Sequence, residues 1–93
     1  MEQLRVLVVE DELLIQMELE ETLREGGCQT CSETSGEAAI GKLESDPQIR
    51  AVITDVNLGG PKTGWDVARR ARELMPDLPV VYVTSSAKTE WAS

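Results

Sequence analysis

An α/β fold built on a right-handed, doubly wound parallel sheet is predicted by three features of the 93-residue sequence. Short apolar runs recur along the chain, and they are continuous, which is typical of strands covered on both faces. Segments with apolar residues at helical spacing lie between these runs. The connections are too long for hairpins, so the order βαβαβαβ favours parallel strands joined by crossover helices.

Four strands are expected. Continuous apolar runs predict the first strand at Val6–Val9 and the third at Ala51–Thr54. A short strand over 28–31 follows the glycine pair that ends a helical pattern, and the fourth strand is expected at 79–84. Each of these runs is bounded by turn-forming or polar residues, so the strands are short.

Three helices are expected between the strands. The first begins after Asp11-Glu12 and continues to Gly26-Gly27, with apolar residues at Ile15, Leu19 and Leu23 and with Leu14 and Met17 beside them. The second follows a predicted capping box, Thr34 to Glu37, and ends at Pro47.

The third helix is expected from Trp65 to Met75, because Pro76 ends the apolar spacing there. Trp65 is expected to pack onto the sheet. Cys28 and Cys31 are expected to be two small buried residues. No histidine and no further cysteine is available for a zinc site, and the pair does not sit at the strand-to-helix turn typical of redox dithiols.

The composition excludes several classes of function. Seventeen acidic and nine basic residues give a net charge of −8, so direct binding of nucleic acid by this domain is not expected. No apolar run approaches the ~20 residues that cross a bilayer, and the first residues lack the features of a secretory signal. A cytoplasmic protein without membrane contact is therefore expected.

Carboxylates and a hydroxyl follow the predicted strands. Glu10 and Asp11 follow the first strand, Asp55 follows the third, and Thr84 ends the fourth. In open α/β sheets, ligands bind beyond the carboxyl ends of the strands. Converging carboxylates repel one another unless a cation lies among them, and oxygen ligands favour a hard ion such as Mg²⁺. Asp55 is then a candidate nucleophile that forms an acyl phosphate, and Thr84 a candidate donor to that phosphate.

Three segments resemble, in order and in spacing, the motifs of response-regulator receiver domains: 6–12, 52–58 and 80–85. The resemblance implies a flavodoxin-like fold in which Asp55 accepts a phosphoryl group from a phosphohistidine of a sensor histidine kinase or phosphotransfer protein. It also implies that Glu10, Asp11, Asp55 and the main-chain carbonyl of Asn57 hold Mg²⁺, with Thr84 as the switch hydroxyl. Such a domain is a signalling switch that assists its own phosphorylation and dephosphorylation, and is not an enzyme.

Two departures from the family pattern stand out. The loop after Asp55 has Leu58-Gly59-Gly60 where many receivers have Met-Pro. Receivers also continue into a fifth strand, with a lysine that pairs with the phosphate and an aromatic switch residue, and then into a final helix. The sequence stops at Ser93, and Lys88 lies too close to Thr84 to replace that lysine.

Residues 1–93 are therefore expected to form a receiver domain that is C-terminally incomplete, without the last βα unit. This arrangement would leave the fourth strand as an apolar edge, and such edges pair with other chains. A dimer through that edge is predicted, and Trp91 is expected to be exposed.

Two alternatives remain from other functional classes. A chain with the receiver fold but without the family lysine could act as a phosphorylation-independent interaction module. A covalent phosphatase could use Asp55 as its nucleophile, but haloacid-dehalogenase-like enzymes have a second aspartate where this chain has Asn57. Flavin or nucleotide binding is disfavoured because no glycine-rich phosphate loop occurs.

Overall fold

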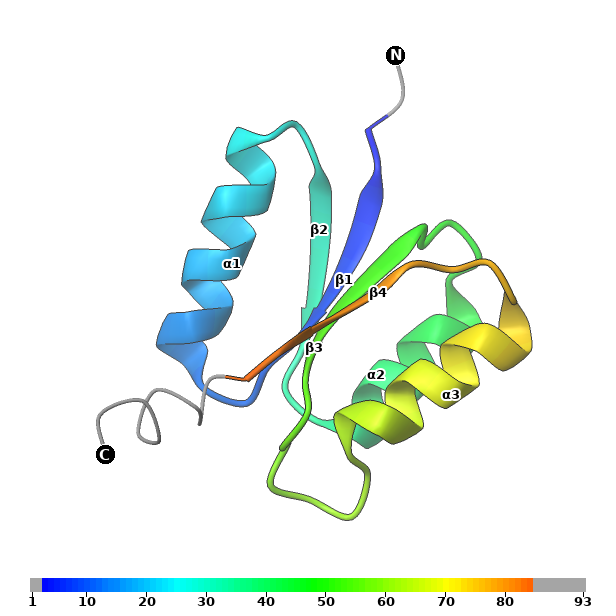
Figure 1. The fold of residues 1–93 in the computed structure, drawn as a ribbon. Coiled ribbons are helices and arrows are strands. Elements are labelled where there is room, and N and C mark those ends of the chain that lie inside the picture. Colours follow the sequence, from blue (N-terminus) through cyan, green and yellow to red (C-terminus); the bar gives the residue numbers. More distant parts are fainter. Residues whose placement is uncertain (1–2, 85–93) are drawn as a thin grey trace.

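The computed structural model describes residues 3–84 and confirms the predicted α/β class. Its elements are β1 (Arg5–Val9), α1 (Leu13–Glu25), β2 (Gln29–Glu33), α2 (Gly36–Ser45), β3 (Ala51–Asp55), α3 (Gly64–Leu74) and β4 (Val80–Val83). The strands form one parallel sheet in the order β2-β1-β3-β4. Helix α1 covers one face, and α2 and α3 cover the other (Figure 1). This is the doubly wound, flavodoxin-like arrangement that was predicted.

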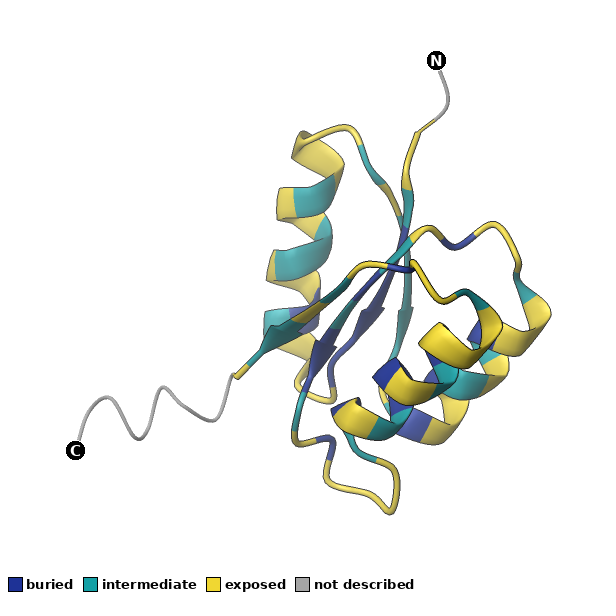
Figure 2. Ribbon diagram, turned by 45° about the vertical axis from the view of Figure 1, so that its right-hand side comes forward, coloured by how far each residue is buried: buried dark blue, intermediate teal, exposed yellow. Residues whose placement is uncertain are grey.

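The core lies around the two central strands, as the dark ribbon of Figure 2 shows. Leu7, Val8 and Val9 are fully buried in β1, and Val52 is fully buried in β3. Both faces of these strands are covered, which explains why the apolar run of β1 is continuous. Each such side chain contributes roughly 1.5–3 kcal/mol on burial. The buried central strands therefore hold the residues that follow them in fixed positions.

Helix α1 is packed more loosely than its apolar pattern predicts. Ile15, Leu19 and Leu23 are half-buried, and the flanking Leu14 and Met17 are exposed. The buried residue of α1 is instead the polar Gln16. The apolar stripe on this helix is therefore only partly confirmed.

The start of α2 differs from the prediction by one residue. The capping box from Thr34 to Glu37 was wrong, because Ser35 is the N-cap and its side chain accepts a hydrogen bond from the Ala38 N–H at 3.1 Å. Gly36 is the first helical residue and lies against Lys62, whose Cβ would be 2.6 Å from an added Cβ. Thr34 and Ser35 are both good N-cap residues, so local sequence does not choose between them.

The cysteines are less buried than expected, whereas Trp65 packs onto the sheet as predicted. Cys28 precedes β2 and Cys31 lies within it, and both are half-buried free thiols, because β2 is at the sheet edge. Trp65 is 53% exposed and packs its ring against Tyr82 of β4, with ring centroids 4.5 Å apart. It contacts a residue of the sheet but is not buried by it.

Within residues 3–84, no helix has the length and apolar character needed to span a membrane. The sequence expectations for Lys88 and Trp91 concern positions outside the described residues.

Candidate functional site

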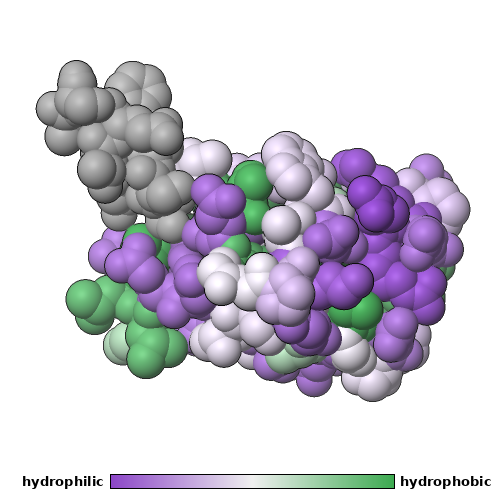
Figure 3. Space-filling model, turned by 90° about the horizontal axis from the view of Figure 1, so that it is seen from below, coloured by the Kyte–Doolittle hydropathy of each residue, from purple (hydrophilic) through white to green (hydrophobic). Residues whose placement is uncertain are grey.

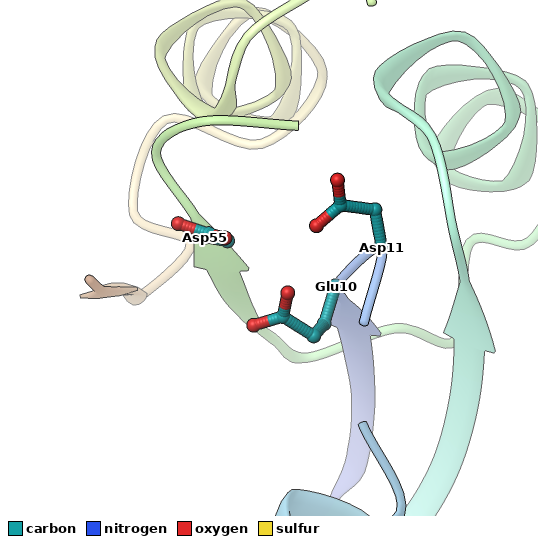
Figure 4. A group of neighbouring side chains, drawn as sticks. All are labelled: Glu10, Asp11 and Asp55. Atoms are coloured by element: carbon teal, nitrogen blue, oxygen red, sulfur yellow. The ribbon is translucent and has the colours of Figure 1, made fainter. Parts of the chain in front are cut away.

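Three carboxylates from two adjacent strands meet at the carboxyl edge of the sheet. Glu10 and Asp11 follow β1, and Asp55 is the last residue of β3. Val9 and Thr54 are paired in the sheet, so Glu10 and Asp55, which come next, are at neighbouring positions. One oxygen of each carboxylate lies within 4.8 Å of the others. Figure 4 shows the three side chains at the neighbouring ends of β1 and β3. Glu10 and Asp55 are buried, whereas Asp11 is exposed. The cluster is thus anchored in the sheet and open on the Asp11 side.

The Glu10 carboxylate is buried with only part of its hydrogen-bonding capacity satisfied. Its Oε2 accepts a hydrogen bond from the Glu12 N–H at 3.2 Å, while Oε1 is buried and has no hydrogen-bond partner among the described residues. Burial raises the pKa of Glu10 to about 7, the Glu12 N–H opposes this rise, and the charges of Asp55 and Asp11 add to it. A buried oxygen without a partner, beside two further carboxylates, fits a divalent cation with oxygen ligands.

Asp55 is held by hydrogen bonds from neighbouring residues and by the start of α3. Its Oδ1 accepts a hydrogen bond from the Asn57 N–H at 3.2 Å, and its main-chain carbonyl accepts one from the Thr54 hydroxyl at 2.9 Å. Gly64 lies directly against this carbonyl, and an added Cβ would be 2.9 Å from the Val56 Cα. The first residue of α3 therefore fixes the backbone that carries the Asp55 side chain.

The loop between β3 and α3 is fixed at both of its ends. Leu58 is 5% exposed and anchors the loop in the core. Gly59 has a φ of +72°, a conformation that favours glycine, and an added Cβ would lie 3.3 Å from Asp11 Oδ2. At the other end, Thr63 and Asp66 form the capping box that starts α3. The loop thus passes next to the exposed carboxylate of the cluster.

Sequence reasoning named every member of the acidic cluster, and the structure brings Glu10, Asp11 and Asp55 together. Asn57 lies two residues beyond Asp55, and the predicted role of its carbonyl stays a prediction. Thr84 follows Val83, the residue paired with Asp55, and is exposed at the same edge.

Two residues that shape this site were missed. Gly64 appeared in the sequence as an ordinary loop residue, although a glycine at a helix start next to a functional strand can signal close backbone approach. Gln16 gave no signal, because polar residues on a surface helix are usually solvated.

Comparisons with known proteins agree with this geometry. The family model "Response regulator receiver domain" matches residues 6–93. A solved receiver protein from Sinorhizobium medicae is 38% identical with a TM-score of 0.88, and the match covers 98% of this chain and 73% of that one.

Two proteins of Pseudomonas aeruginosa are also similar. The two-component response regulator PprB is 39% identical over 54 residues, covering 58% of this chain and 20% of PprB. The chain therefore spans about a fifth of the length of that relative. The receiver domain of the sensor histidine kinase PA1611, solved with magnesium in its active-site cleft, is 24% identical with a TM-score of 0.80, covering 92% of this chain and 70% of that one.

The family match spans the sheet, the acidic cluster and the loop beside it. The chain belongs to the response regulator receiver domain family of two-component systems.

Proposed function

We propose that this receiver accepts a phosphoryl group on Asp55 in a reaction that requires Mg²⁺. The observation that carries the proposal is the meeting of Glu10, Asp11 and Asp55 within 4.8 Å, with the buried Glu10 Oε1 lacking a partner within residues 3–84. Magnesium in the cleft of the PA1611 receiver supports the choice of ion. The ligands would be these carboxylates and the main-chain carbonyl of Asn57.

The proposed donor is a phosphohistidine of a sensor histidine kinase or a phosphotransfer protein. An oxygen of the Asp55 carboxylate attacks phosphorus, the P–N bond breaks, and its electron pair stays on the imidazole nitrogen, which takes a proton. Bound Mg²⁺ would supply positive charge that offsets the negative charge of the phosphoryl oxygens. The hydroxyl of Thr84 would donate a hydrogen bond to the new acyl phosphate.

The domain is proposed to be a signalling switch and not an enzyme with a separate substrate. Asp55 and its neighbours assist both the formation and the hydrolysis of the acyl phosphate. The added charge at the end of β3 then favours one of two conformations of the surrounding loops. Which output this switch controls depends on the whole protein.

An exposed apolar patch on α1 is the proposed docking surface for the phosphohistidine donor. Leu13, Leu14 and Met17 are 62%, 76% and 59% exposed. These residues occupy the first turns of α1, which begins two positions after Asp11. Viewed from the edge that carries the carboxylates, apolar surface gathers at the left, over α1 (Figure 3). Exposed apolar groups of this kind mark interaction surfaces.

The test is phosphorylation of the full chain by a small donor. Acetyl phosphate with Mg²⁺ is expected to increase the intact mass by one phosphoryl group, and beryllofluoride with Mg²⁺ is expected to change the tryptophan fluorescence. Both effects should disappear in Asp55→Asn and persist in Asp77→Asn, which removes an exposed carboxylate from the turn before β4. A wild-type chain that forms neither adduct would instead favour the phosphorylation-independent interaction module.

We also propose that the 93-residue chain pairs with a second copy through β4. This strand is one of the two edge strands of the sheet within residues 3–84, and Val81 on it is 53% exposed. Unpaired strand edges with apolar side chains are pairing sites. Sedimentation should show a dimer that Val81→Lys weakens, whereas a monomer at high concentration would overturn the proposal. The cytoplasmic location and the lack of direct nucleic-acid binding stay predictions.

A further inference from the structure

Gln16 is an unusual residue of α1. It is 8% exposed, and it is the buried residue of a helix whose larger apolar side chains at 13, 14 and 17 are exposed. Burying a carboxamide costs free energy unless its polar atoms are hydrogen-bonded. Packing alone therefore does not account for a buried glutamine at this position, and its hydrogen bonds matter.

The Gln16 side chain joins the ends of two strands. Its Nε2 donates to the Glu10 main-chain oxygen at 3.2 Å and to the Glu33 main-chain oxygen at 3.3 Å. The same Glu33 oxygen also accepts from the Glu10 N–H at 3.1 Å. Both N–H groups of the carboxamide thus have an acceptor where the β1–β2 ladder ends.

These hydrogen bonds fix one particular peptide unit. The carbonyl of Glu10 and the N–H of Asp11 belong to the same planar group. The Gln16 donor on that carbonyl therefore fixes the orientation of the peptide plane. The Cα atoms of Glu10 and Asp11 lie at the two ends of this plane, so its orientation determines where both side chains point. Immediately afterwards the chain turns into α1, with Glu12 as its N-cap. The side chain of Gln16, in the first turns of α1, thus holds the main chain where it passes from β1 into the helix.

We propose that Gln16 is a positioning residue for the divalent cation. By holding the Glu10–Asp11 peptide unit, it keeps the two carboxylates of β1 at the separation from Asp55 that the cation needs. The inference rests on the proposed metal-dependent function, and it adds a residue of α1 that does not itself touch the cation. Residues that orient metal ligands typically contribute 10–100-fold in affinity.

The test compares two substitutions by calorimetric titration of the full chain with Mg²⁺. Gln16→Met keeps the length of the side chain but removes both donors, and it is expected to lower the affinity about tenfold. Ile49→Val is the matched control, since this residue is buried two positions before β3, at the end of the strand opposite to Asp55. It should lower the stability of the fold and leave the Mg²⁺ affinity unchanged.

A second measurement separates positioning from general stability. The side-chain amide signals of Gln16 in ¹H–¹⁵N spectra are expected to shift when Mg²⁺ binds, because their acceptor lies on a metal-ligating residue. Equal Mg²⁺ affinity of Gln16→Met and wild type, measured well below their unfolding temperatures, would overturn the inference. A wild type without Mg²⁺ affinity would overturn the proposed function itself, so the two failures are distinguishable.

Discussion

Glu10 is the residue at which burial and charge conflict most strongly. It lies fully buried beside Asp55, and one of its oxygens has no hydrogen-bond partner among the described residues. Its pKa is raised to about 7, mainly by burial. In water such a carboxylate would ionise near 4.5. A bound cation removes the conflict, so the protonation of Glu10 and metal binding compete with each other.

The affinity for Mg²⁺ is therefore expected to fall as the pH decreases through about 7, because a proton then occupies the Glu10 carboxylate. Glu10→Gln should bind Mg²⁺ more weakly and should lose most of this pH dependence. The measurement is calorimetric titration at constant ionic strength. Glu18→Gln removes an exposed carboxylate of α1 and should keep the wild-type profile. An unchanged profile in Glu10→Gln would contradict the assignment.

The same carboxylate predicts how stability depends on pH without metal. The pKa of Glu10 is higher in the folded chain than in the unfolded chain, so the unfolded chain loses its proton first as the pH rises. The free energy of unfolding should then decrease from about pH 4.5 to about pH 7, relative to Glu10→Gln. Urea denaturation in the presence of a chelator measures this. A difference between the two proteins that does not vary over this range would show that Glu10 does not cause the effect.

Residue types at strand ends predicted the acidic cluster, because parallel strands bring their carboxyl ends to one edge of the sheet. The supporting contacts could not be predicted in this way. Gln16 contacts the main-chain oxygens of Glu10 and Glu33, and Gly64 contacts the main chain of Asp55 and Val56. Their roles depend on how closely α1 and α3 approach the sheet, and no local pattern encodes that distance.

At the scale of elements, the start of α3 is tied to β3, the strand that ends in Asp55. Gly64 touches the main chain of Asp55, and its N–H donates to the Val56 carbonyl at 2.8 Å. The capping box of Thr63 and Asp66 fixes the same turn. The position of α3 and the position of Asp55 are therefore coupled through backbone contacts.

Two glycine-to-alanine substitutions test this coupling. Gly64→Ala forces a Cβ into the Asp55 backbone, so both stability and Mg²⁺ affinity should fall. Gly41→Ala adds the same methyl group inside α2, where nothing lies within 4 Å, and should stabilise the fold by up to about 1 kcal/mol. Urea denaturation and metal titration measure both effects. Similar behaviour of the two variants would show that Gly64 is not in tight contact.

The exposed patch of α1 makes a separate prediction about the donor. Replacing Leu14 and Met17 together by alanine is expected to slow phosphotransfer from a phosphohistidine protein, because apolar contact area is lost. Phosphorylation by acetyl phosphate should not change, since that donor needs no docking surface. Leu74→Ala is the control on α3, where this leucine is 45% exposed. An equal loss with both donors would place the defect in the chemistry and not in docking.

The helices were predicted well in number and less well in detail. Proline and glycine signals located the ends of α1 and α3 to within about one or two residues. The N-cap of α2 was displaced because Thr34 and Ser35 are equally suitable by type. The buried face of α1 was misjudged because Leu14 and Met17 continue the apolar pattern without being covered within residues 3–84.

At the scale of the whole molecule, the alternation of strands and helices predicted a right-handed doubly wound parallel sheet, and the structure confirms it. The strand order β2-β1-β3-β4 depends in addition on which face each helix covers, and α1 lies on one face while α2 and α3 lie on the other. The same topology places β1 beside β3, so the carboxylates of both strands share one edge. A cation at that edge would link the two central strands of the fold.

Binding at this edge should therefore stabilise the fold as a whole. A ligand that binds only the folded chain adds about 2.7 kcal/mol at a concentration one hundred times its dissociation constant. Mg²⁺ is expected to raise the Tm of the wild type, and a chelator should reverse the rise. Asp11→Asn should weaken the effect, while Glu18→Gln, which removes the same charge outside the cluster, should not. Both variants reduce the net negative charge equally. A rise in Tm that is the same in the wild type and in both variants would therefore indicate general screening of the acidic surface, and not a site at the ends of β1 and β3.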